Sequence, residues 1–142
     1  MIFKLKPFTH QHIPEIRQSL SQWYPEFTAP IHFIPVRGDF TRGIFATVYT
    51  SIDLDLDQAK KLFTKYYADE PFVKLTDENP DLKQVVNTNK CVLYLEKHQD
   101  KLLIISALDN LLKGASGQAV QNMNIMYGWP EESGLRLKGV VY

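Results

Sequence analysis

Apolar positions along the chain recur at two spacings, and the spacing separates expected helices from expected strands. Residues 13–24, IPEIRQSLSQWY, carry an apolar stripe at helical spacing, so we expect a helix there. Its members are Ile16, Leu20 and Trp23. A second helix is expected between Asp53 and Pro71. Its apolar positions are Ala59, Leu62, Phe63 and Tyr66.

Short apolar runs predict the strands. They lie at 31–36, 43–52, 71–75, 85–89, 91–96 and 101–108. The run 43–52, GIFATVYTSI, is nearly apolar on both faces, so we expect its own fold or a partner to bury both sides. With a final helix, the order αββαββββα predicts an α+β fold with a mixed β-sheet covered by helices. The chain has no G-x-G-x-x-G segment, which disfavours a doubly wound nucleotide-binding domain.

The final helix is expected over DNLLKGASGQAVQNMN, residues 109–124, and contains Gly114 and Gly117. Each glycine costs about 1 kcal/mol relative to alanine inside a helix, so two of them require a reason. Gln118 and Asn122, four residues apart, share one face. A thin helix with an amide face can approach another backbone or a flat polar ligand. Close packing of the helix on the sheet is the alternative.

Composition narrows the function classes. The 142 residues suit one domain, and 16 basic against 16 acidic side chains argue against nucleic-acid binding. No apolar run approaches the roughly 20 residues of a membrane span, and no signal peptide is apparent, so no membrane association is expected. A single cysteine, Cys91, cannot form an internal disulfide, which favours a reducing compartment, the cytoplasm.

Candidate proton-transfer groups lie in THQHIPEI. His10 and His12 are two residues apart, so on an extended segment both rings point to one side. Glu15 follows His12 by three residues across a helix start, close enough to orient an imidazole. An imidazole is the usual proton shuttle near neutral pH. Two surface histidines beside a helix start are the alternative.

Candidate anion-binding groups are Arg37 and Arg42, which flank GDFT and could hold a carboxylate or a phosphate. Two solvated loop arginines are the alternative. Lys4 and Lys6 could serve similarly with weaker geometry. Cys91 alternates with apolar positions of a strand, which favours a packed thiol over a nucleophile.

No metal site is expected. His10 and His12 supply two ligands without an evident third. Alternating aspartates before a helix are typical of capping, and a calcium loop would need a glycine and a closing glutamate that are absent. These aspartates are Asp53, Asp55 and Asp57.

Several segments together resemble a known family. They are HQHIPEI, RGIFATVY, YYADEPFV, NTNKC, SALDNLLKGASGQAVQNMN and GWPEESGL, in this order. The chain resembles, over essentially its whole length, the C-terminal part of the N-acetyl-gamma-glutamyl-phosphate reductase family of arginine biosynthesis. This resemblance implies a domain, residues 1–142, similar to the C-terminal catalytic and dimerisation domain of glyceraldehyde-3-phosphate-dehydrogenase-like enzymes.

The resemblance also implies a mechanism. Such enzymes use NADPH and a cysteine nucleophile, both on an N-terminal nucleotide-binding domain, to reduce an acyl phosphate to an aldehyde. A histidine of the H-x-H-x-P-E-I motif, His10 or His12, is the implied acid/base, and Glu15 matches the motif's glutamate. The implied contacts of the small-molecule acyl phosphate are Arg42 and Lys6. The implied contacts of NADP are Asn110, Gln118 and Asn122.

The resemblance further implies two partner surfaces. The helix within 108–127 is expected to pack on the N-terminal nucleotide-binding domain near the nicotinamide, with Gly114 and Gly117 thinning it there. The sheet is expected to form a dimer or a tetramer, which would bury the apolar strand at 43–52.

This chain departs from the family pattern in several places. It has no phosphate-binding glycine loop and no P-G-C nucleophile segment, so we expect the isolated chain to be inactive. Gln11 stands where family members often have arginine. Family members commonly lack the VRGDFT form of the loop before Arg42, so the resemblance assigns no role to Arg37. Two alternatives remain: a non-catalytic oligomerisation domain, or a sister reductase acting on a related acyl phosphate. The match over 106–124 disfavours aspartyl phosphate, and carrier-bound aminoadipyl phosphate stays open.

Overall fold

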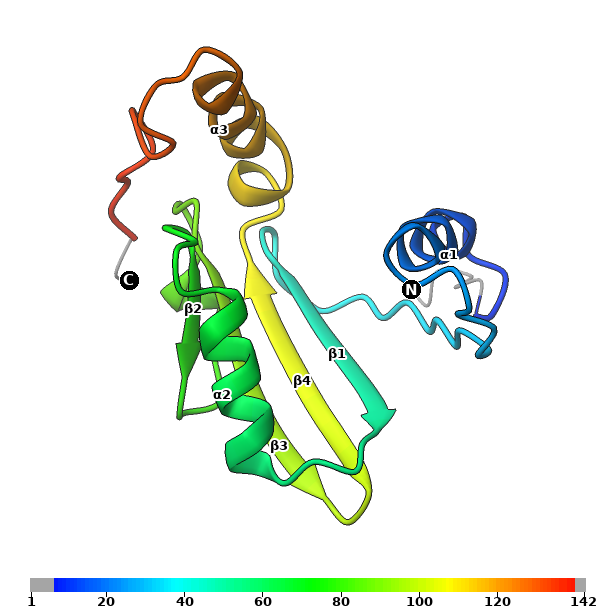
Figure 1. Cartoon of the computed structure of the whole chain (residues 1–142). Helices are drawn as coiled ribbons and strands as arrows, with labels where there is room; N and C mark the ends of the chain where they lie inside the picture. The colour runs from blue at the N-terminus through cyan, green and yellow to red at the C-terminus, as the bar shows by residue number, and fades with distance from the viewer. Residues whose placement is uncertain (1–6, 140–142) are drawn as a thin grey trace. The chain divides into compact units, whose positions relative to one another are not determined.

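The computed structural model describes residues 7–139, which fall into two compact units that divide after Asp39. Figure 1 shows the elements of both units.

The first unit contains one helix, α1, His12–Trp23, as the apolar stripe predicted. Glu15 lies in its first turn, where a carboxylate interacts favourably with the helix dipole. No residue of α1 is buried. The predicted strand at 31–36 is wrong, because these residues form no ladder. Pro35 has no N–H to donate to a strand. A backbone hydrogen bond joins Phe8 N–H to the Phe33 carbonyl at 2.8 Å.

The second unit is built on a four-stranded mixed sheet with the order β1-β4-β3-β2. Its strands are β1, Ile44–Ser51, β2, Val73–Thr76, β3, Cys91–His98, and β4, Lys101–Leu108. β3 and β4 form the hairpin predicted around KHQD, β1 pairs antiparallel with β4, and β2 pairs parallel with β3. The α+β fold with a mixed sheet, expected from the sequence, is therefore confirmed.

The predicted strand at 85–89 is also wrong. These residues form turns after a short 3₁₀ helix, η1, Leu82–Gln84. Thr88 donates its hydroxyl to the Val85 carbonyl at 2.7 Å, and Asn87 has a φ of 62°, a value that does not fit a strand. Val85 is nevertheless fully buried, so the apolar residue that suggested a strand packs as part of a turn.

α2, Leu56–Tyr66, covers one face of the sheet in front of β3 (Figure 1). Asp55 begins the helix: its carboxylate accepts from Gln58 N–H, and the Gln58 side chain accepts from Asp55 N–H. The predicted stripe is only half buried, because Leu62 and Tyr66 are 58% and 70% exposed. The core on this face is formed by Ala59, Leu95 and Leu102, with Phe63 and Leu75 among the side chains packed against it.

On the opposite face of the sheet, a second core cluster lies near one end. Val92 and Ala107, paired across β3 and β4, pack there with Val85 and Leu82. β1 is an edge strand whose side chains are mostly exposed on both faces. Phe45 and Tyr49 on one face are 41% and 66% exposed, and this unit leaves the apolar strand uncovered.

The last helix begins with a π turn, η2, Leu112–Ser116, and continues as α3, Gly117–Met126, beyond the end of β4 (Figure 1). Bonds five residues apart define the π turn: Gly114 N–H donates to the Asp109 carbonyl at 2.9 Å, and Ser116 N–H to the Leu111 carbonyl at 3.0 Å. The helix predicted at 109–124 is confirmed, whereas periodicity gave no sign of the π turn.

Candidate functional site

Asp109 joins three segments of the second unit at the start of the final helix. Its side chain is fully buried. Oδ1 accepts the N–H groups of Leu111 and Leu112 at 2.8 and 2.9 Å, and Oδ2 accepts Asn87 N–H at 2.7 Å. Arg42 Nε lies 2.7 Å from Oδ2. Among the described residues that N–H has no hydrogen-bond partner, so its contact with Asp109 is an ion pair.

The pKa of the Asp109 carboxyl reflects these contacts. Burial alone would raise the pKa, since it disfavours the charged form. The N–H groups of Leu112, Asn87 and Leu111 and the guanidinium of Arg42 favour the carboxylate more strongly, and the pKa lies below its usual value. Asp109 is therefore a buried anion that fixes where the final helix begins.

Two predicted contact residues, Arg42 and Asn110, belong to this junction. Asn110 Oδ1 accepts Gly43 N–H at 2.6 Å, so both residues tie the segment before β1 to the segment after β4. Arg42 keeps 30% of its side chain exposed. The positions of both residues are thus set by the fold, and their substrate and cofactor contacts stay predictions.

An amide network covers one side of α3. Lys113 donates to Gln118 Oε1 at 2.9 Å and to Gln121 Oε1 at 2.7 Å. Gln118 Nε2 donates to Asn122 Oδ1 at 3.0 Å, and Asn89 Nδ2 donates to Gln121 Oε1 at 3.1 Å. The two predicted residues Gln118 and Asn122 therefore lie side by side, and Asn122 is exposed.

Lys113 was not among the residues singled out from the sequence, yet it is the only cation of this network. Burial lowers the pKa of Lys113, and the nearby carboxylates of Glu131 and Glu70 act in the opposite direction. Its Nζ also lies 5.6 Å from the centre of the Phe72 ring, within cation–π range. Residues five apart face different sides of a regular α-helix, so only the π turn brings Lys113 to Gln118.

The packing around Gly117 explains why this position of the helix is a glycine. A Cβ there would overlap Asn89 Oδ1 and lie 2.9 Å from the Leu112 carbonyl oxygen. The close approach that requires this glycine thus comes from Asn89 of the same chain. A Cβ at Gly114 would find its nearest atom at 3.6 Å, ordinary contact, so the fold of this chain does not require that glycine.

The histidines lie in the first unit. The ring centres of His10 and His12 are 4.6 Å apart in an edge-to-face arrangement, and the His10 ring lies 4.7 Å from the Phe33 ring. His10 Nδ1 accepts His12 backbone N–H at 3.3 Å. Glu15 is exposed, and within residues 7–139 no hydrogen bond joins it to His12. Lys6 lies outside the described residues.

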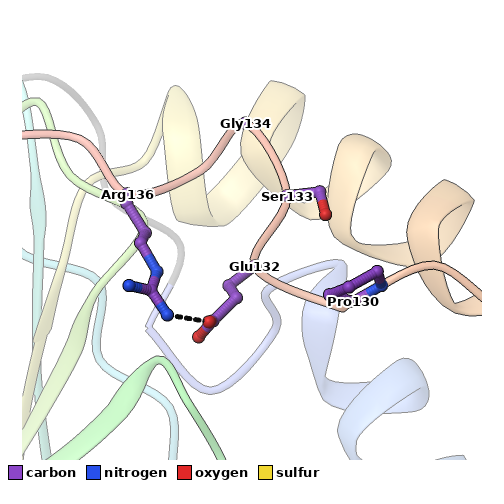
Figure 2. Close-up of a pocket in the computed structure, with 5 residues that line it drawn as sticks. All are labelled: Pro130, Glu132, Ser133, Gly134 and Arg136. Atoms are coloured by element: carbon purple, nitrogen blue, oxygen red, sulfur yellow. Dashed lines mark hydrogen bonds and ion pairs between the residues drawn. The ribbon is translucent and has the colours of Figure 1, made fainter.

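Two hollows among the described residues of the second unit are lined by none of the predicted residues. One, of about 360 Å³, is formed by the turn after α3, where Glu132 and Arg136 form an ion pair across it (Figure 2). The other, of about 410 Å³, lies between α2 and β2 and includes Lys60 and Tyr67. Within the described part of the chain, no three His, Cys, Asp or Glu side chains gather as a metal site would require.

Residues 2–110 match the model of a protein family described as the semialdehyde dehydrogenase dimerisation domain. The chain belongs to this family. The match covers the whole sheet and ends at Asn110, where the final helix begins.

Relatives of this dimerisation-domain family are similar along most of the chain. A protein named N-acetyl-gamma-glutamyl-phosphate reductase from Phocaeicola vulgatus is 61% identical over 133 residues, 94% of this chain and 41% of the relative. Proteins of the same name from Christiangramia forsetii and Karelsulcia muelleri are 59% and 50% identical, over 94% and 92% of the chain. The chain thus spans about two fifths of the length of these relatives.

Cys91 is half-buried on β3 with Sγ 3.4 Å from Ser106 Oγ, which fits the packed thiol expected from its alternation. Among residues 7–139, no helix is both long enough and apolar enough to pass through a membrane.

Proposed function

We propose that this chain is part of an NADPH-dependent reductase that converts N-acetylglutamyl 5-phosphate to N-acetylglutamate 5-semialdehyde in cytoplasmic arginine biosynthesis. One observation carries the proposal: relatives about 60% identical over 94% of the chain bear the name of this reductase. The chain would supply the acid/base and an assembly surface, and the nucleophile and most of the cofactor site would come from an N-terminal domain.

The histidine pair supports the acid/base role. A thiolate that attacks the acyl phosphate expels phosphate and leaves a thioester, and reduction of that thioester ends with an aldehyde and a free thiolate. NADPH, when bound, supplies the hydride. His10 or His12 would give a proton to the oxygen that becomes negative during these steps. Their ring centres lie 4.6 Å apart, which supports a proposal in which one imidazole assists while the other transfers the proton.

The final helix supports the cofactor role. The amide groups of Gln118 and Asn122 form a polar surface on α3 that fits the carboxamide of a nicotinamide. In this proposal, residues 108–127 pack on the nucleotide-binding domain. Exposed apolar side chains there would be covered by that contact. They include Met126 at 82% and Tyr127 at 69% exposure, and Tyr127 stacks on Trp129, just beyond this range, with ring centres 5.2 Å apart.

Assembly through the sheet is the second part of the proposal. Membership of a dimerisation-domain family supports a homo-oligomer. β1 is the best candidate for the contact between subunits, because Phe45, Val48 and Tyr49 are exposed on its two faces and would be buried in a dimer or a tetramer.

Histidine variants test the catalytic role in the full-length enzyme. We expect His10→Asn or His12→Asn to lower kcat about 10²–10⁴-fold for whichever ring transfers the proton, while the oligomer mass stays unchanged. His32→Asn, an exposed histidine of the same unit, is the matched control. Normal turnover in both variants with intact assembly would instead favour a non-catalytic oligomerisation domain.

The 142-residue chain alone provides a second test. Without the N-terminal nucleophile, it should oxidise no NADPH when the acyl phosphate is present, as followed at 340 nm. Substrate-dependent oxidation by this chain would contradict the assignment. In the full-length enzyme, comparison of acetylglutamyl phosphate with carrier-bound aminoadipyl phosphate distinguishes the proposed substrate from that of a sister reductase.

A further inference from the structure

Lys113 determines the direction of the hydrogen bonds that lead through Gln118 to Asn122 on α3. An ammonium group only donates, so the side-chain oxygens of Gln118 and Gln121 must face it. With its oxygen turned toward Lys113, Gln118 presents its NH₂ group to Asn122. Asn122 must then accept with its oxygen, and its own NH₂ group points away from the network.

The branch through Gln121 runs in the same direction. Gln121 also accepts from Asn89, so Asn89 must present its NH₂ group to Gln121. Asn89 Oδ1 is then left against Gly117, and it is buried with no hydrogen-bond partner among the described residues. An unpaired buried acceptor costs about 1–3 kcal/mol. If the Asn89 amide were reversed, it would place oxygen against oxygen at Gln121, which is why the unpaired oxygen is retained.

We propose that Lys113 is a positioning residue that makes α3 present the NH₂ group of Asn122 as a donor to an acceptor oxygen of a bound ligand. Within residues 7–139, Asn122 Nδ2 has no partner, and the side chain is exposed on the surface of the helix. The inference rests on the proposed function for its two candidate ligands: the carboxamide oxygen of NADPH and a phosphate oxygen of the acyl phosphate.

The helix geometry explains why a lysine can do this. The π turn brings Lys113 beside Gln118, five residues later, and Gln121, eight residues later. Gln121 Nε2 in turn donates to Glu131 Oε1, and Asn124 Nδ2 donates to the carbonyls of Glu131 and Ser133 at 2.9 and 3.0 Å. The inner side of α3 is thereby fixed, and only the Gln118–Asn122 branch ends at solvent.

The first experiment reverses the terminal donor in the full-length enzyme. Asn122→Asp replaces the donor with a second acceptor of the same shape, and Asn122→Ala removes it. We expect the KM of the affected ligand to rise at least about tenfold in Asn122→Asp and roughly 2- to 10-fold in Asn122→Ala. A rise in KM for NADPH identifies the carboxamide, and a rise for the acyl phosphate identifies the phosphate. Unchanged KM values for both ligands in Asn122→Asp would overturn the proposal.

The second experiment tests whether Lys113 acts through the amide chain. Lys113→Met should raise the same KM, Lys113→Arg should recover most of the loss, and Lys113→Met should add little in an Asn122→Ala background. Additive losses would mean a general structural role and would overturn the proposal. Lys65→Met, which removes an exposed charge on α2, is the matched control and should leave both KM values unchanged.

Gln118→Glu keeps an acceptor oxygen for the Lys113 ammonium group. A carboxylate still pairs with Lys113, but it has no NH₂ group to orient Asn122. We expect a rise in KM comparable to that of Asn122→Ala, with normal circular dichroism and oligomer mass. A wild-type KM in this variant would mean that Lys113 does not act by orienting the Gln118 amide, and this result would overturn the proposal.

Direct titration of NADPH by fluorescence distinguishes failure of the roles of Asn122 and Lys113 from failure of the proposed reductase. If the wild-type enzyme is active and Asn122→Asp changes neither NADPH binding nor the KM of the acyl phosphate, the roles of Asn122 and Lys113 are overturned while the proposed reductase stands. An inactive full-length wild type would contradict the proposed reductase. Titration of NADPH into the wild type and the Asn122 variants would still measure whether the donor binds the cofactor.

Discussion

The two groups of candidate residues differ in how firmly the chain holds them. The histidines lie on a unit in which α1 buries no side chain, and His10 and His12 contact each other and Phe33 through rings that remain partly exposed. The amides of α3 lie on a unit in which Asp109 and Asn89 are fully buried and hydrogen-bonded to distant segments.

This difference indicates which features are intrinsic to the chain. The direction of the amide network is set by contacts within the second unit. The described residues of the first unit include the two histidines of the proposed proton shuttle and no buried side chain, so we expect further contacts in the whole protein to fix their position.

The largest expected effect concerns the contrast in local stability. In the 142-residue chain, amide hydrogens of α1 should exchange at least roughly 100-fold faster than those of β3 and β4, because local opening of α1 exposes no buried side chain. Hydrogen exchange followed by mass spectrometry measures both regions in one sample. Equal protection of the two regions would remove the distinction drawn between the units.

The next effect concerns Asp109. In Asp109→Asn, the NH₂ group that replaces Oδ2 would face Asn87 N–H and Arg42, donors against donors, at a buried position. We expect a loss of about 3 kcal/mol in the free energy of unfolding of the second unit at pH 7, measured by urea denaturation.

The pH dependence of this loss of stability shows whether the charge of Asp109 or the shape of its side chain causes it. The pKa of Asp109 is lowered on folding, so the carboxylate stabilises the fold above its usual pKa of about 3.9. This contribution is lost as pH falls from about 4 through the lower folded-state value. The gap between wild type and Asp109→Asn should therefore narrow below pH 4. A gap of constant size down to pH 2 would mean that shape and not charge causes the loss.

The smallest effect compares the two helix glycines. Gly117→Ala should destabilise the second unit by about 1–3 kcal/mol, because the new methyl group overlaps the Asn89 side chain and crowds the Leu112 carbonyl. Gly114→Ala is the matched control and should be neutral or stabilising by up to about 1 kcal/mol, since a Cβ fits there. Equal melting temperatures for the two variants would show that Asn89 can move away without cost.

Local patterns predicted the elements whose partners are close in sequence. The β3–β4 hairpin, α2 with its aspartate cap and the final helix each follow from spacing, turn residues and capping groups. The predicted strands at 31–36 and 85–89 failed for one reason: an apolar run shows that residues are buried or extended, not that a neighbouring strand is available to pair with them. Val85 is buried in a turn instead.

The candidate site was predictable in part. Helical spacing placed Gln118 beside Asn122, and the structure agrees. Lys113 was missed because its alignment with Gln118 depends on a π turn, for which the sequence offers no established signal beyond the paired glycines. The role of Asp109 was missed because its partners, Asn87 and Arg42, are 22 and 67 residues away in sequence from Asp109.

The uncovered edge strand has a consequence for how the protein must be made. In the sheet of the described residues, β1 is an edge strand with apolar side chains on both faces, and an edge strand can pair with another extended chain. A newly synthesised copy therefore risks amyloid-like self-pairing until its β1 is covered. Rapid subunit association would then act as protection against aggregation, and dilution or slow assembly should favour insoluble material over a stable monomer.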